Sequence, residues 1–189
     1  MWPWGHLAVG YLCFVLYTQY SDRSAQTTFT VAAVAIGSQF PDLVDKPLAW
    51  TFAILPSGRS FAHSLLTAGI IVLVVYQMSR RWHHEDTAVA FAIGYVTHSL
   101  ADLGPDVVWG LLRGDGSQLE WTTYLFWPLL EVPPYQSDSS FLAHFAAFAV
   151  DPYVLFQFGL SGVALAVWVR SGTPGLSAVS RLVGRSEPS

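Results

Sequence analysis

Long apolar segments constrain the fold of this chain more than any other feature. They cover residues 4–20, 27–40, 61–79, 87–103 and 152–170. A helix needs about 20 predominantly apolar residues to cross a bilayer, so segments of this kind predict membrane-spanning helices. The composition agrees, because 52% of the residues are hydrophobic and only 12% are charged. We therefore expect an all-α fold, a polytopic membrane helical bundle of about five transmembrane helices.

The regions around the last apolar segment predict an interfacial stretch and a tail. Residues 104–140 are polar and aromatic, and their WTTYLFWPLL sequence predicts an interfacial loop because Trp and Tyr favour the headgroup level. FLAHFAAFAV then predicts a short helix, and Asp151-Pro152 predicts the N-cap and first residue of the last helix. We expect a membrane-embedded domain over residues 1–170 and a flexible tail, rich in Gly, Ser, Pro and Arg, over residues 171–189.

Composition also restricts the partners of the chain. The net charge is only -4, and no cluster of basic residues with interleaved aromatics is present, so nucleic acid is not an expected partner. The single Cys13 excludes an intrachain disulfide. The expected partners are the lipid bilayer and a lipid or lipid-linked substrate.

Polar residues that are costly in apolar segments occur at the segment ends. The phrase His-Ser-Leu appears twice, in FAHSLL and in YVTHSLADLG, at the start of the third segment and the end of the fourth. If successive segments alternate in direction, one membrane face receives six such residues: His6, Asp42, Asp45, His63, His98 and Asp102.

The spacing of these residues favours a shared metal site. His98 and Asp102 are four residues apart and lie on one helix face, and Asp42 and Asp45 are three apart on a turn opened by Pro41. Mixed imidazole and carboxylate ligands suit Zn²⁺ best, with Mn²⁺ or Fe²⁺ as alternatives. Six candidates are enough for one ion or for two ions bridged by a carboxylate. A buried polar network without metal is the alternative, and Asp45 could instead pair with Lys46 or Arg59.

The remaining histidines and two serines are weaker candidates. His83 and His84 stand among charged residues and are expected in a solvated loop. His144 precedes the last segment and could be an extra ligand or a proton carrier. Ser64 and Ser99 each follow a histidine, but adjacent helix residues point about 100° apart, so we expect hydroxyls bonded to backbone carbonyls or orienting a ligand, not nucleophiles.

Several of these motifs together resemble a known family. Gly5-His6, GSQFPDLVDK, RSFAHSL and HSLADL, with a weaker echo in Trp127-Pro128, resemble the membrane-bound metal-dependent hydrolases. These proteins are described as LexA-binding, inner-membrane-associated hydrolases and are distantly similar to zinc-dependent phospholipase C. The resemblance covers a little over half of the chain. It implies metal binding at the same six positions and places Arg59 near the site.

A hydrolytic mechanism follows if the resemblance holds. A metal-bound water would attack a phosphoester or ester, Asp45 would take a proton, and Arg59 would stabilise negative charge on the substrate. The alternative is a non-catalytic membrane protein with a structural metal or a buried polar network.

The distribution of basic residues predicts the orientation. With alternating segments, the face with the six polar residues holds Lys46, Arg59 and Arg113. The other face holds the remaining basic residues, which are Arg23, Arg80, Arg81, Arg170, Arg181 and Arg185. The positive-inside rule then predicts a multi-pass protein of the cell membrane with an extracytoplasmic metal site and a cytoplasmic C-terminus.

Overall fold

The chain folds into helices joined by short connections. The computed structural model describes residues 1–21, 26–134 and 140–176, and within these residues every regular element is a helix, which confirms the all-α prediction. The longer helices are α1 (Pro3–Tyr20), α2 (Thr28–Gly37), α4 (Leu65–Arg80), α5 (Glu85–Ala101) and α8 (Pro152–Arg170). The shorter elements are α3 (Phe40–Lys46), the π-helix η1 (Pro47–Thr51), α6 (Gly104–Leu112), the 3₁₀-helix η2 (Gly116–Phe126) and α7 (Phe141–Ala146).

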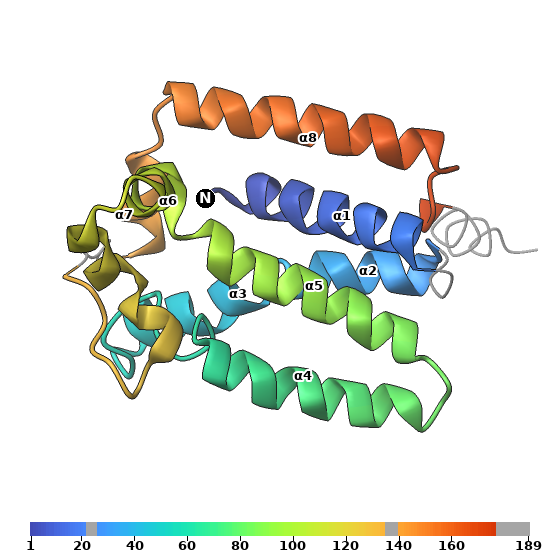
Figure 1. The fold of residues 1–189 in the computed structure, drawn as a ribbon, viewed down its shortest axis with the longest axis horizontal. Coiled ribbons are helices and arrows are strands. Elements are labelled where there is room, and N and C mark those ends of the chain that lie inside the picture. The colour runs from blue at the N-terminus through green and yellow to red at the C-terminus, as the bar shows by residue number, and fades with distance from the viewer. Residues whose placement is uncertain (22–25, 135–139, 177–189) are drawn as a thin grey trace, which may run out of the picture.

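The longer helices lie side by side, and the short elements gather at one end of them (Figure 1). Helix α5 packs against α1, α2 and α4, whereas α8 packs against α1. The chain direction alternates from each longer helix to the next, so the starts of α1, α4 and α8 meet the ends of α2 and α5. We call this end, where α3, α6 and α7 also lie, the site end.

Local sequence signals explain where several helices begin. Asp151 accepts a hydrogen bond from the Val154 amide and Pro152 opens α8, which confirms the predicted N-cap. Ser64 caps α4 in the same way through the Leu66 amide. Helix α4 therefore begins four residues after the predicted start at residue 61. Asp42 was expected on a turn opened by Pro41, but it lies in the first turn of helix α3, where proline is well tolerated.

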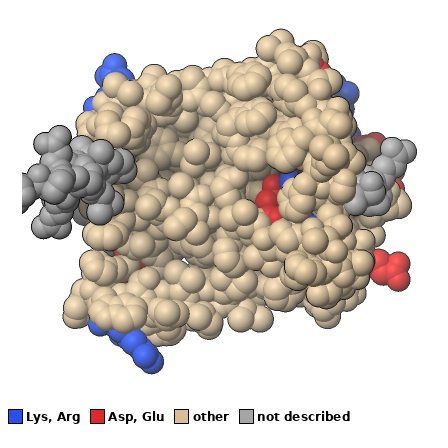
Figure 2. Space-filling view, turned by 180° about the vertical axis from the view of Figure 1, so that it is seen from behind, with Lys and Arg blue, Asp and Glu red and all other residues tan. Residues whose placement is uncertain are grey.

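The helices differ in whether they are long enough to cross a membrane. Among the described helices, α8 is long and apolar enough to cross a bilayer, and α4 is apolar but shorter. Helix α2 has only 10 residues and spans about 15 Å, half of the roughly 30 Å hydrocarbon core. The arrangement with five crossings stays a prediction. On the face in Figure 2, acidic and basic atoms lie mainly toward the two ends, with uncharged residues between them.

A close contact between two glycines sets the distance between α2 and α5. A Cβ atom on Gly94 would lie 2.4 Å from the Val34 carbonyl oxygen, and one on Gly37 would lie 2.3 Å from the Phe91 carbonyl oxygen. Neither separation is sterically tolerable, so only glycine permits this approach. The contact matters for the site because Ser38, directly after α2, lies against His98 on α5.

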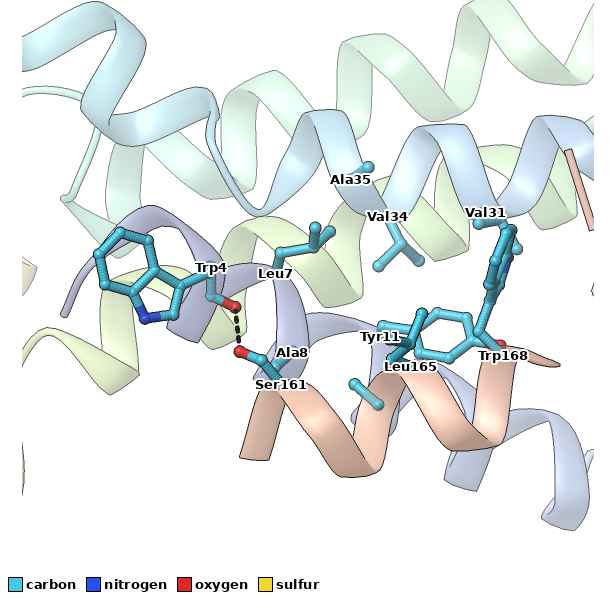
Figure 3. A pocket seen from close by; sticks show the side chains of 11 residues that line it. Trp4, Leu7, Ala8, Tyr11, Val31, Val34, Ala35, Ser161, Leu165 and Trp168 are labelled. Carbon is cyan, nitrogen blue, oxygen red and sulfur yellow. Dashed lines mark hydrogen bonds between the residues drawn. The ribbon is translucent and has the colours of Figure 1, made fainter. Parts of the chain in front are cut away.

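A separate crevice lies between α1, α2 and α8 (Figure 3). Its volume is about 290 Å³, and its lining is aliphatic and aromatic apart from the Ser161 and Tyr11 hydroxyls. The Ser161 hydroxyl donates to the backbone carbonyl of Gln157 over 2.8 Å and lies 3.3 Å from that of Trp4. The crevice contains no imidazole or carboxylate among the described residues that line it, so the chemistry expected from the sequence must lie elsewhere.

The glycine contact yields a stability prediction. Gly94→Ala should lower the free energy of unfolding by about 1–3 kcal/mol, the usual cost of overpacking, because the new methyl group meets backbone atoms of α2. Gly159→Ala is the matched control, since no atom lies within 4 Å of the position that its Cβ would take and alanine favours helices. Thermal unfolding in detergent measures both. Equal transition temperatures for the two variants would contradict this account of the α2–α5 contact.

Candidate metal centre

Two buried histidines face each other at the site end with defined tautomers. His63 Nδ1 lies 2.8 Å from a carboxylate oxygen of Asp45, and His98 Nδ1 lies 2.6 Å from the Ser38 carbonyl oxygen. An ionised carboxylate and a carbonyl only accept hydrogen bonds, so each Nδ1 must carry a proton. In the neutral rings, neither Nε2 then carries one. The two Nε2 atoms lie 3.2 Å apart, a separation at which a proton or a cation must lie between them.

Two carboxylates complete a group around the same space. Asp42 Oδ1 lies 3.5 Å from His63 Nε2 and 3.7 Å from His98 Nε2, and Asp102 Oδ2 lies 3.4 Å from His63 Nε2. One ligand atom from each of the four residues lies within 4.8 Å of the others. Atoms bound to one tetrahedral Zn²⁺ at about 2.0–2.1 Å lie about 3.4 Å apart, so this donor set fits a single divalent ion.

Asp45 has different surroundings from Asp42 and Asp102. Its side chain is fully buried, and its two oxygens accept hydrogen bonds from the backbone amides of Ser60, Ala62 and His63 at 2.9, 2.7 and 3.2 Å. The same carboxylate holds His63 Nδ1. Carboxylates that orient a ligating imidazole in this manner are common behind metal ligands. The geometry therefore ties Asp45 to the loop before α4 and to the orientation of His63.

His6 lies beside the four-residue group, at the start of α1. Its ring stacks on that of His98, with the centroids 3.7 Å apart and the planes at 18°. Its Nε2 is 3.0 Å from Asp102 Oδ1, but neither ring nitrogen has a hydrogen-bond partner of acceptable geometry among the described residues, although both are buried. Burial disfavours the charged form of an imidazole, so a buried ring nitrogen in this state is available to ligate an ion.

Basic groups neutralise two of the carboxylates. Lys46 Nζ lies 2.7 Å from Asp42 Oδ2, and Arg59 Nε lies 2.8 Å from Asp102 Oδ2. The sequence had raised Asp45 as an alternative partner for these basic side chains, but their close ion pairs are with Asp42 and Asp102. Asp102 Oδ1 also lies 2.6 Å from the amino group of Met1.

The surroundings of Asp42 keep it ionised. Burial raises the pKa of the Asp42 carboxyl, but the imidazoles of His63 and His98 and the ammonium of Lys46 lower it by more. The pKa of Asp42 therefore lies well below its ordinary value, and the group is an anion at neutral pH. An anionic oxygen that faces two imidazole Nε2 atoms is a suitable environment for a cation.

The structure thus brings the six predicted residues together at the site end and adds two features that the sequence did not predict. The Ser38 carbonyl orients His98, but a backbone oxygen leaves no trace in the sequence. Lys46 follows Asp42 by four residues, and this helical spacing was the available signal for their pairing.

The serines and the other histidines lie as follows. Ser64 donates to the backbone carbonyl of Trp127 over 2.7 Å, whereas the buried Ser99 hydroxyl has no hydrogen-bond partner within the described part of the chain. His83 and His84 are exposed between α4 and α5, as expected. His144 lies on α7 at the site end and packs between the rings of Trp2 and Trp50.

Comparison with known proteins identifies a family for the chain. A family model described as YdjM inner membrane protein matches residues 1–179. Searches of curated proteins and of solved structures found no match. Membrane location is therefore supported by the family, and a buried group of metal-binding side chains is present in the structure.

The hydrogen bonds that Asp45 accepts lead to a stability prediction. Asp45→Asn should destabilise the protein by about 1–3 kcal/mol, because an amide nitrogen cannot accept the backbone and imidazole protons that the carboxylate accepts. Asp151→Asn is the matched control, since asparagine caps a helix about as well as aspartate. Chemical denaturation of the metal-free protein measures both. A loss of stability no larger for Asp45→Asn than for Asp151→Asn would contradict the role assigned to Asp45.

Proposed function

Because the chain belongs to the YdjM family of inner membrane proteins, we propose that it is an integral-membrane, metal-dependent hydrolase. One observation carries the proposal. The Nε2 atoms of His63 and His98 lie 3.2 Å apart and face buried carboxylates. Two ring nitrogens at this separation need a proton or a metal cation between them, and we propose the metal because four ligand atoms surround the same space.

The ligand set favours Zn²⁺, with Mn²⁺ or Fe²⁺ as alternatives, because Ca²⁺ and Mg²⁺ prefer shells made of oxygen alone. We propose that Asp42, His63, His98 and Asp102 hold one ion. A second ion would need His6 and Asp102 Oδ1 as ligands. A bound ion of this kind lowers the pKa of its water toward 7 and so supplies a nucleophile at neutral pH.

The surrounding residues have separate roles in this proposal. Asp45 positions His63 and is not the proton acceptor, because its oxygens already accept hydrogen bonds. His6 Nε2, which is buried and lies 3.0 Å from Asp102 Oδ1, is the further ligand available to a second ion. Arg59, whose guanidinium reaches Asp102, stabilises negative charge on the substrate.

The position of the site suggests the class of substrate. The site lies where the ends of several apolar helices meet, and at a membrane face the available substrates are phosphoesters or esters of lipids or lipid-linked molecules. We propose five crossings with the site end extracytoplasmic, because Arg80 and Arg170 end α4 and α8 at the opposite end. Arg23, Arg181 and Arg185, which share that predicted side, lie outside the described residues, as does most of the tail.

Two non-catalytic alternatives must be separated from this proposal. In a metal-free polar network, one imidazole would have to hold two protons so that an N–H could point at the other Nε2 or at a carboxylate. In a structural metal site, the coordination shell would be closed. A pocket lined by Asp42 favours the catalytic alternative, because it gives a small molecule space beside one of the proposed ligands.

Metal content tests the proposed ligands. The protein purified without chelator should retain about one transition metal ion per chain, or about two if His6 helps to hold a second ion. His98→Ala and Asp42→Ala should each remove most of this metal because each deletes a ligand atom. His83→Ala, which replaces an exposed histidine between α4 and α5, should retain it. Elemental analysis that finds the wild-type protein at the level of a buffer blank would refute metal binding.

Hydrolysis tests the proposed reaction separately. Phospholipids and small chromogenic phosphoesters and esters should be hydrolysed in a reaction that chelation abolishes and Zn²⁺ or Mn²⁺ restores. Asp102→Asn should reduce the rate by at least about 100-fold, since this side chain contacts both the ligand set and Arg59. If metal-loaded wild-type protein and Asp102→Asn show the same background rate on every substrate, the site is not hydrolytic.

A further inference from the structure

A small pocket adjoins the metal centre on the side of α3, η1 and α7. Its volume is about 140 Å³, below the roughly 300–1,000 Å³ of pockets that hold drug-sized ligands, so it fits a small group and not a whole lipid. Asp42 and Lys46 contribute its charged groups, and Trp50, Phe141, His144 and Phe145 are among its aromatic residues. Figure 2 shows acidic and basic atoms next to each other in a recess that is bordered mainly by uncharged residues.

Asp42 connects this pocket with the metal centre. Its Oδ1 faces the imidazoles of His63 and His98, whereas its Oδ2 faces Lys46. The Asp42 carboxylate therefore lies between the pocket and the space in which a metal ion would bind. A group bound in the pocket would lie next to this proposed ligand.

The charges at the site favour an anion in the pocket. Three carboxylates (Asp42, Asp45 and Asp102) lie among two basic side chains, Lys46 and Arg59. With a divalent ion bound, the three carboxylates, the two basic side chains and the ion together would carry a net positive charge. The Met1 amino group beside Asp102 would increase it. Burial weakens solvent screening, so the excess charge would attract an anionic group strongly.

Lys46 is the pocket residue best placed to bind that anion. Its ammonium has three N–H donors, and one contacts Asp42 Oδ2. The Nζ atom also lies 5.4 Å from the centre of the Trp50 ring, which limits the freedom of the side chain. The ammonium is thus held at the pocket wall, where it can donate to a ligand without a large loss of side-chain entropy.

Aromatic rings in mutual contact line much of the rest of the pocket. The His144 ring lies 4.8 Å from that of Trp2 and 5.5 Å from that of Trp50, and Trp50 lies 5.0 Å from Phe141. These rings provide apolar surface next to the charged groups, as a substrate with a polar end and an apolar body requires.

Building on the proposed function, we propose that this pocket binds the phosphoryl group of the substrate, with Lys46 as its anion-binding residue. A tetrahedral phosphoryl group has several anionic oxygens, so it can contact a metal ion and the Lys46 ammonium at once, whereas the carbonyl of a neutral ester has one uncharged oxygen. The inference narrows the substrate from esters in general to phosphoesters. The phosphoryl group could belong to a lipid or to a soluble molecule.

Phosphate binding tests this inference independently of catalysis. The full-length protein is loaded with Zn²⁺, its zinc content is measured, and inorganic phosphate is titrated by calorimetry. Lys46→Gln should weaken phosphate binding by about 10-fold or more with zinc retained, because a charge-assisted hydrogen bond is lost. Lys46→Arg should bind within about 3-fold of the wild type, because the positive charge remains. Arg113→Gln, which removes a basic residue that lies over Trp109 at the C-terminal end of α6 and does not line the pocket, should leave binding unchanged.

Further variants and lipids complete the experiment. Lys46→Met keeps the apolar stem near Trp50 and replaces Lys46→Gln if the latter does not fold. Competition by phosphatidylcholine nanodiscs with and without phosphatidic acid separates a lipid phosphate from a soluble one. Unchanged phosphate affinity in zinc-loaded Lys46→Gln or Lys46→Met, or no phosphate binding by the zinc-loaded wild type, would overturn the inference while leaving the metal site intact. A wild-type protein that cannot be loaded with zinc would instead overturn the proposed function and this inference with it.

Discussion

Three buried carboxylates at one end of the helices must be compensated, and the surrounding structure is arranged to do so. Asp45 is compensated by backbone amides and by His63, Asp42 by Lys46, and Asp102 by Arg59. Removing a buried ion's partner typically costs several kcal/mol, so each pairing constrains the segment that supplies it. The loop before α4 is folded around Asp45, and α3 directs Asp42 toward both the centre and the pocket.

These pairings also set the protonation of the two facing histidines. Asp45 and the Ser38 carbonyl each accept a hydrogen bond from an Nδ1–H, which directs both Nε2 atoms toward the carboxylates of the site. Ser38 reaches His98 only because α2 and α5 approach at Gly37 and Gly94. The packing of α2 against α5 therefore also positions His98. A substitution at Gly37 or Gly94 is expected to alter the geometry of the metal centre.

The sequence predicted the parts of this arrangement that depend on local patterns. Apolar segments and the Asp151-Pro152 cap located the long helices, and polar residues at segment ends indicated one shared end. Pairing was harder to predict because it depends on three-dimensional positions: Lys46 adjoins Asp45 in sequence but lies one helical turn from Asp42. The role of Asp45 depends on the loop conformation, and that of Ser38 on a backbone atom. Helix α2 ends at Gly37, before the predicted boundary at residue 40, and the separate short helix α3 follows it. The apolar composition of residues 27–40 did not reveal this break between two helices.

X-ray absorption at the zinc edge tests the central claim most directly, because it reports the atoms bound to the ion. For protein loaded with one zinc per chain, the account predicts a shell of nitrogen and oxygen at about 2.0–2.1 Å with the scattering of two imidazoles. His98→Ala should lose the scattering of one imidazole. A shell containing sulfur at about 2.3 Å, or one without imidazole scattering, would contradict the account.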